Sequence, residues 1–114
     1  MDAREKRLAQ NEALYREINE RIEAIAKRQD MPGEATPDFA YFCECANADC
    51  NLQITVPREL YEWVRSEPHR FVVAPGHETP EVETVIREER GFRVVEKEGE
   101  AARYVEHLDP RGRG

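Results

Sequence analysis

The three cysteines of this chain, Cys43, Cys45 and Cys50, lie within eight residues. Single cysteines in a protein core behave as small hydrophobic residues, so three thiols on one short segment indicate chemistry rather than packing. A soft metal ion would bind them as thiolates, and zinc is the leading candidate. Because structural zinc takes four ligands, the sequence predicts one zinc ion held by these cysteines and one further residue.

Two histidines compete for the fourth position. His77 follows a proline and a glycine, in a turn that could fix its imidazole, and Glu78 could accept a hydrogen bond from its second ring nitrogen. Chain topology favours His69, because a parallel strand–helix–strand crossover would place it near Cys50. We favour His77 and keep His69 as its rival. His107 is expected at the surface.

Other readings of the cysteine segment stay open. Two cysteines one residue apart can form a strained disulfide with Cys50 as the resolving thiol, so the segment could be a redox switch that also binds zinc. Unligated thiols are a third reading. A catalytic zinc is not expected, because such sites keep a position for water and their ligands are richer in histidine. Glu44 and Glu78 are expected to be solvated rather than to act as bases, and we assign no catalytic residue.

The charge distribution limits the kind of partner. The chain has 114 residues and a formal net charge of -7, and residues 1–30 carry equal numbers of basic and acidic side chains. The negative excess therefore lies in residues 31–114, which argues against nucleic acid as the main partner. No signal peptide and no membrane-spanning segment is recognisable, so we expect a cytoplasmic protein. In a reducing compartment, clustered cysteines more often hold metal than form disulfides.

The first 30 residues predict an amphipathic, coiled-coil-like helix, because residues 2–28 contain neither proline nor glycine. With Asn11 included, its apolar residues follow an alternating three-four spacing typical of a helix seam. We expect this seam to bind a protein partner or to mediate self-association. The alternative is a helix that packs on its own domain. The predicted partner-binding residues are Leu8, Tyr15, Ile18, Ile22 and Ile25.

Residues 31–37 contain two prolines and a glycine and predict a linker, after which a small metal-binding domain spans residues 38–109 and a flexible tail spans residues 110–114. Alternating residues predict strands at 39–42 and 52–56, paired as a hairpin whose loop holds the thiols. Pro57 is expected to start a short helix that ends at Pro68. Residues 71–74 predict a central strand, and residues 92–97 predict another. The fold class is α+β: a long N-terminal helix followed by a small zinc-stabilised domain with a mainly antiparallel sheet and one short packed helix.

Four segments together resemble a family of short, uncharacterised actinobacterial proteins: Cys43–Glu44–Cys45, Cys50, Arg70–Glu78 and Val94–Lys97. In that family an amphipathic N-terminal helix similar to residues 11–22 precedes a CxCxxxxC cluster and a VxPGHE-type segment. The resemblance implies a site made from Cys43, Cys45, Cys50 and His77, and it does not support His69. It brings no activity.

The sequence therefore favours a structural-zinc protein-interaction module, a small cytoplasmic adaptor or regulator. The first alternative is a regulator in which thiol oxidation expels zinc. The second is a nucleic-acid-associated zinc protein.

Overall fold

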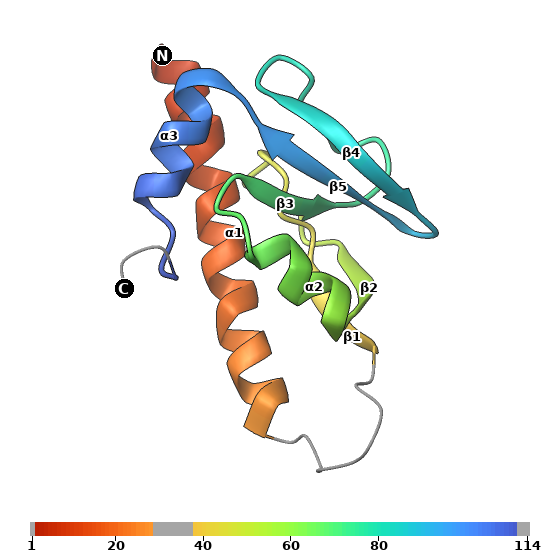
Figure 1. Ribbon diagram of the computed structural model, residues 1–114. Coiled ribbons are helices and arrows are strands. Elements are labelled where there is room, and N and C mark those ends of the chain that lie inside the picture. The colour runs from red at the N-terminus through yellow and green to blue at the C-terminus, as the bar shows by residue number, and fades with distance from the viewer. Residues whose placement is uncertain (1, 29–37, 112–114) are drawn as a thin grey trace.

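The computed structural model describes residues 2–28 and 38–111, which form a long helix followed by a small α+β domain, as predicted (Figure 1). The elements in chain order are α1 (Ala3–Arg28), β1 (Asp38–Phe42), β2 (Gln53–Pro57), α2 (Arg58–Arg65), β3 (Arg70–Val73), β4 (Glu83–Glu89), β5 (Phe92–Lys97) and α3 (Gly99–His107).

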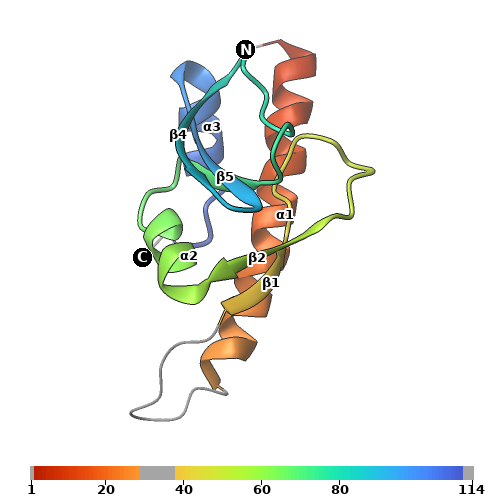
Figure 2. The same ribbon diagram turned by 90° about the vertical axis from the view of Figure 1, so that its right-hand side faces the viewer.

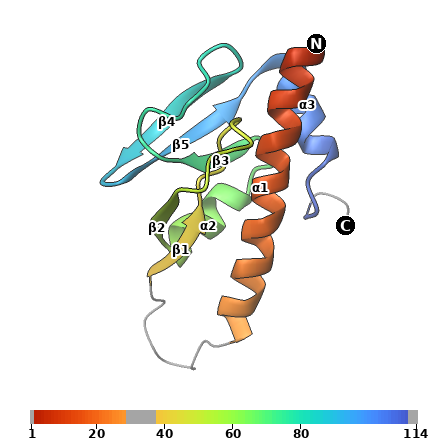
Figure 3. The same cartoon turned by 180° about the vertical axis from the view of Figure 1, so that it is seen from behind.

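Helix α1 runs along the whole domain (Figures 1 and 3). It contacts α3 along its N-terminal half and β1 towards its C-terminal end. No residue within it breaks the backbone hydrogen-bond ladder, so it continues unbroken for 26 residues. It therefore packs on its own domain, and pairing with a second chain stays a prediction.

Strands β1 and β2 form the predicted antiparallel hairpin, with Tyr41 opposite Ile54 and Phe42 opposite Gln53. Cys43 N donates to Leu52 O at 2.9 Å and extends the pairing by one step. The connecting loop, residues 43–52, carries all three cysteines and lies between α1 and the second sheet (Figure 3). The hairpin thus places the thiols in the interior of the molecule.

The second sheet is antiparallel in the order β3-β5-β4, so β5 is its central strand. The prediction of a central strand at residues 71–74 is wrong, because β3 lies at an edge. Its outer side is covered by the cysteine loop, where Glu44 N donates to Val72 O at 2.7 Å. The strongly apolar sequence of β3 therefore reflects burial by a loop and not a place between two strands.

Strands β2 and β3 belong to different sheets, although α2 connects them. The parallel crossover that would bring His69 to Cys50 therefore does not form. Helix α2 follows Pro57 as predicted, and in Figure 2 it lies beside the hairpin. It also contacts α1, through the ion pairs Arg58–Glu23 and Arg65–Glu20.

The core contains Tyr41 and Tyr61, whose rings stack with centroids 4.2 Å apart, and the fully buried Phe71. Trp63 on α2 is 38% exposed, and the guanidinium groups of Arg70 and Arg87 lie 4.3 and 5.3 Å from its ring centroid. A second short helix, α3, follows β5 and buries Ala101 and Val105.

The face of α1 that packs on the domain is unusually polar. Glu12, Arg16, Asn19 and Glu23 are buried, and each has a partner in the domain. The predicted seam residues lie mostly beside this face: Leu8, Tyr15, Ile18 and Ile22 are half-buried, whereas Ile25 is 51% exposed. The most exposed large apolar side chain on the helix is Leu14.

The predicted linker at residues 31–37 lies outside the described residues. Within the predicted tail, Arg111 forms ion pairs with Glu20 and Glu62, and residues 112–114 lie outside the description. No helix in residues 2–28 and 38–111 has both the length and the apolar character needed to cross a membrane.

Candidate metal centre

Two loops bring four potential metal ligands together. The loop between β1 and β2 contributes Cys43, Cys45 and Cys50, and the turn after β3 contributes His77. The three sulfur atoms and one ring nitrogen all lie within 4.8 Å of one another, and the cysteines are buried. This is the set that the sequence predicted, and it could hold a metal ion.

Two of the distances between the ligand atoms agree with a tetrahedral site. Nδ1 of His77 lies 3.6 Å from Cys43 Sγ and 3.6 Å from Cys50 Sγ. A tetrahedral zinc ion with Zn–S near 2.3 Å and Zn–N near 2.0–2.1 Å would place a sulfur and a nitrogen ligand about 3.5–3.6 Å apart. Both distances are therefore those expected for ligands of one shared zinc ion.

Turn geometry explains how each loop presents its ligands. Asn47 accepts a hydrogen bond from Asp49 N at 2.9 Å, and its carbonyl accepts one from Cys50 N at 3.0 Å. Asn47 is thus the turn residue that allows Cys50 to fold back towards Cys43. On the other loop, Gly76 adopts a φ of 85°, which favours glycine, and His77 N donates to Ala74 O at 3.0 Å.

Backbone donors surround the sulfur atoms. Ala74 N donates to Cys43 Sγ at 3.1 Å, and Asn47 and Leu52 provide backbone donors to Cys45 and Cys50. Such N–H groups stabilise thiolates, which are the form that binds metal.

The pKa values of the three thiols diverge because the thiols form hydrogen bonds with one another. Hydrogen bonds, the largest from the Cys43 thiol and another from His77, lower the pKa of Cys45 to about 5 against the effect of burial. The hydrogen bond between Cys43 and Cys45, together with burial, raises the pKa of Cys43. Burial raises the pKa of Cys50. A metal ion would supply the positive charge that all three thiolates need.

The rival histidine lies elsewhere. His69 Nε2 is 3.0 Å from Glu106 Oε2 on α3, and His69 is not part of the cluster. Glu78 does not orient His77 as expected: its carboxylate accepts hydrogen bonds from Gly76 N at 3.0 Å and from Arg93 Nη1 at 2.6 Å. It therefore stabilises the turn that carries His77.

Glu44 has a role that the sequence analysis missed. It is fully buried, so the expectation that it is solvated is wrong. Its carboxylate accepts hydrogen bonds from Val72 N at 3.0 Å, Asn19 Nδ2 at 2.8 Å and the Tyr61 hydroxyl at 3.3 Å. Burial raises its pKa. One signal in the sequence pointed to this role. In an extended segment, the side chain between two ligands at positions i and i+2 faces away from the metal.

Helix α1 holds the cysteine loop from one side. Asn11 Nδ2 donates to Ala46 O at 2.8 Å, and the Tyr15 hydroxyl donates to Ala48 O at 2.9 Å. Asn19 also accepts a hydrogen bond from Phe42 N at 2.8 Å. Two residues predicted to form a seam, Asn11 and Tyr15, therefore help to position the ligands.

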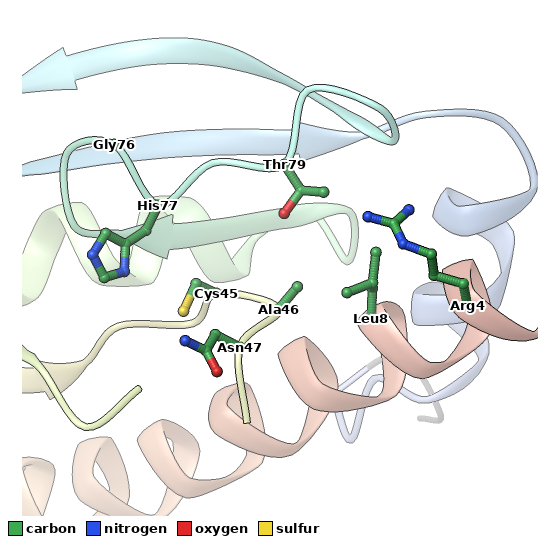
Figure 4. A pocket seen from close by; sticks show the side chains of 8 residues that line it. All are labelled: Arg4, Leu8, Cys45, Ala46, Asn47, Gly76, His77 and Thr79. Atoms are coloured by element: carbon green, nitrogen blue, oxygen red, sulfur yellow. The ribbon is translucent and has the colours of Figure 1, made fainter. Parts of the chain in front are cut away.

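A cavity of about 390 Å³ adjoins the site (Figure 4). Cys45 and His77 form the wall nearest the cluster, and Arg4 and Leu8 of α1 line the opposite end. The remaining lining residues are Ala46, Asn47, Gly76 and Thr79.

Comparisons with protein-family models, with curated proteins and with solved structures found no match. The resemblance to the actinobacterial family therefore stays a prediction, and the case for function rests on the site itself.

Proposed function

We propose that this chain is a small protein-interaction module stabilised by one structural zinc ion. The observation that carries the proposal is the convergence of four protein ligand atoms, from two loops, within 4.8 Å of one another. Four protein ligands complete the coordination of zinc and leave no position for a reacting water molecule. Zinc is favoured over other metals because three thiolates and one imidazole form one of its usual structural ligand sets.

A structural role also follows from where the ion would act. The cysteine loop belongs to the β1–β2 hairpin and His77 follows β3 of the other sheet, so the ion would join the two sheets. A domain of this size buries a limited apolar core, and a metal crosslink adds stability that packing alone supplies only in part. Three thiolates also reduce the Lewis acidity of zinc, which disfavours catalysis. A reducing compartment such as the cytoplasm would keep the thiols available for the metal.

The partner surface that we propose is the outer side of α1 next to α3. Leu14 is 56% exposed there and lines a shallow groove of about 460 Å³ together with Tyr104 and Leu108. Exposed apolar residues in a groove between helices favour an amphipathic helix from a protein partner or from a second copy. Of the residues predicted from the sequence, Ile25 is the one that is free to contribute, because the other four are half-buried in their own domain.

Metal analysis of the histidine variants tests the zinc site. We expect one zinc ion per chain in protein purified under reducing conditions. We expect loss of most of it in His77→Ala and full retention in His69→Ala, because only His77 lies in the cluster. Retention by His77→Ala with loss in His69→Ala would reverse the assignment of the fourth ligand.

Sedimentation analysis over a range of concentrations tests the interaction surface. Self-association that Leu14→Glu abolishes would support a second copy as the partner. A monomer mass at every concentration would exclude self-association and leave a different protein as the only partner to seek.

A further inference from the structure

The cavity beside the metal centre is lined by one of the three cysteines. Cys45 lines the cavity, and Figure 4 shows its sulfur atom beside the imidazole of His77. Cys43 and Cys50 are not among the lining residues. Cys43 Sγ accepts a hydrogen bond from Ala74 N at the end of β3, and Tyr15 holds the backbone of Cys50 against α1. A small molecule in the cavity would therefore meet the Cys45 sulfur first.

The polar groups of the cavity suit an oxygen-containing reagent. Arg4, Asn47 and Thr79 line it, and the side-chain oxygen of Asn47 already accepts a hydrogen bond from Asp49 N. The Asn47 amide N–H groups are then donors available to an oxygen atom. The Arg4 guanidinium is paired with the Glu81 carboxylate. A volume of about 390 Å³ is far larger than the roughly 30 Å³ that a water molecule occupies, so a hydroperoxide fits.

We propose that Cys45 is a site of oxidation by hydroperoxides that enter this cavity, and that its oxidation releases the metal ion. This inference rests on the proposed function, because it needs a metal held by the four ligands. Zinc bound by three thiolates and one neutral imidazole has a net charge of -1, which keeps its thiolates nucleophilic.

The chemistry balances with one hydroperoxide and two thiolates. The Cys45 sulfur attacks one peroxide oxygen, the O–O bond breaks, and the second oxygen leaves as hydroxide and takes a proton to form water or, from an organic peroxide, an alcohol. Cys45 is then a sulfenic acid. The Cys50 thiolate attacks its sulfur, a disulfide forms, and the sulfenic oxygen leaves as water after protonation. Two electrons pass from the two thiolates to the peroxide.

Cys50 is the resolving residue in this scheme. A disulfide between Cys45 and Cys50 closes a longer loop than one between Cys43 and Cys45, and is less strained. All the ligand sulfur atoms lie within 4.8 Å of one another, so the bond requires only a local shift. The disulfide leaves Cys43 and His77 as ligands, which are too few to retain zinc. A thiol reductant would restore the site.

Hydrogen peroxide added to the zinc-loaded full-length chain tests the inference. Zinc release is followed with a metal indicator, and early sulfenic acid is trapped with dimedone and located by peptide mass spectrometry. We expect dimedone first on Cys45 and a later Cys45–Cys50 disulfide. Leu8→Phe narrows the cavity and should slow zinc release several-fold, whereas Leu8→Ala widens it and should speed release. Ala24→Phe, at an exposed position of the same helix outside the cavity, is the control and should release zinc at the normal rate.

First labelling at Cys43 or Cys50 would overturn the inference, as would release rates that do not depend on residue 8. Zinc release without cysteine oxidation would also contradict it. If either Leu8 variant fails to fold or to bind zinc, the order of dimedone labelling in the unmodified chain still tests the inference. Absence of zinc from the unmodified protein would instead refute the proposed function, so the two failures are distinguishable.

Discussion

At the scale of single residues, Glu44 and its two cysteine neighbours have different roles in one short segment. Cys43 and Cys45 face the metal centre, and Glu44 faces the opposite side and bonds to three elements of the fold. The alternation of an extended chain allows both tasks in consecutive residues.

Substitution of Glu44 tests its structural role. Glu44→Ala leaves the Val72 N–H, the Asn19 amide and the Tyr61 hydroxyl without this acceptor, and we expect a loss of about 2–4 kcal/mol in the free energy of unfolding. Glu44→Gln retains one acceptor oxygen and should cost less. Glu67→Ala, at an exposed site, is the control and should stay within about 0.5 kcal/mol. Urea denaturation of the zinc-loaded proteins measures all three, and equal stability of Glu44→Ala and Glu67→Ala would refute this role.

The three cysteines of the candidate site could be predicted from the sequence because cysteine is rare in this chain and the three lie within eight residues. The choice between His77 and His69 depended on the connection of the strands. The turn after β3 brings His77, and not His69, to the cysteines. Glu44 could not be identified with the same ease, since the sequence contains many acidic residues that are exposed. Which acidic residue is buried depends on the groups that pack against it. One of the groups that bond to Glu44 is Asn19, which lies 25 residues away in the chain.

At the scale of elements, α1 is attached through charged and polar groups as much as through apolar packing. Lys97 on β5 is fully buried between Glu12 of α1 and Glu83 of β4, with Nζ 2.6 Å from Glu83 Oε1. Burial raises the pKa of Glu12 well above its usual value, and Lys97 opposes that rise. Two carboxyl groups thus share one amine in the interior.

Substitutions in this cluster should have unequal effects. Lys97→Met leaves two buried carboxyl groups facing each other without a cation, and we expect a loss of about 3–5 kcal/mol in unfolding free energy. Glu12→Gln mimics the protonated carboxyl and keeps the Lys97–Glu83 pair, so it should cost about 1 kcal/mol or less. Thermal and urea unfolding measure both. A larger loss in Glu12→Gln than in Lys97→Met would show that the ionised Glu12 carboxylate, and not the amine, holds the helix.

The elements themselves were largely predictable. The absence of proline and glycine predicted α1, and the alternation of apolar residues predicted the β1–β2 hairpin. The arrangement of β3 was not predictable, because a strand covered by a buried loop and a strand between two neighbours have the same apolar composition. The buried face of α1 was also missed, since its residues are polar and became buried only with partners distant in the sequence.

At the scale of the whole molecule, the metal centre lies where three parts meet: the β1–β2 hairpin, the β3-β5-β4 sheet and α1. Bonds from Asn11 and Tyr15 extend the site into the helix. Loss of the ion should therefore loosen the contacts between these parts more than each part internally.

Removal of zinc by a chelator under reducing conditions tests this arrangement by hydrogen exchange. We expect faster exchange in residues 43–52 and 74–78, and in the part of α1 that bonds to the loop. The β4–β5 hairpin should change least, because its pairing does not involve the ligand loops. The zinc-loaded form should be more stable by about 4 kcal/mol or more if zinc exceeds its dissociation constant a thousandfold. Uniform exchange changes across the chain would contradict a local crosslink.

Zinc K-edge X-ray absorption of the protein purified under reducing conditions, with the metal quantified in the same sample, tests the central claim most directly. We expect one zinc ion per chain, with three sulfur atoms at about 2.3 Å and one nitrogen at about 2.0–2.1 Å. A protein without stoichiometric zinc, or a zinc ion coordinated mainly by oxygen, would contradict it.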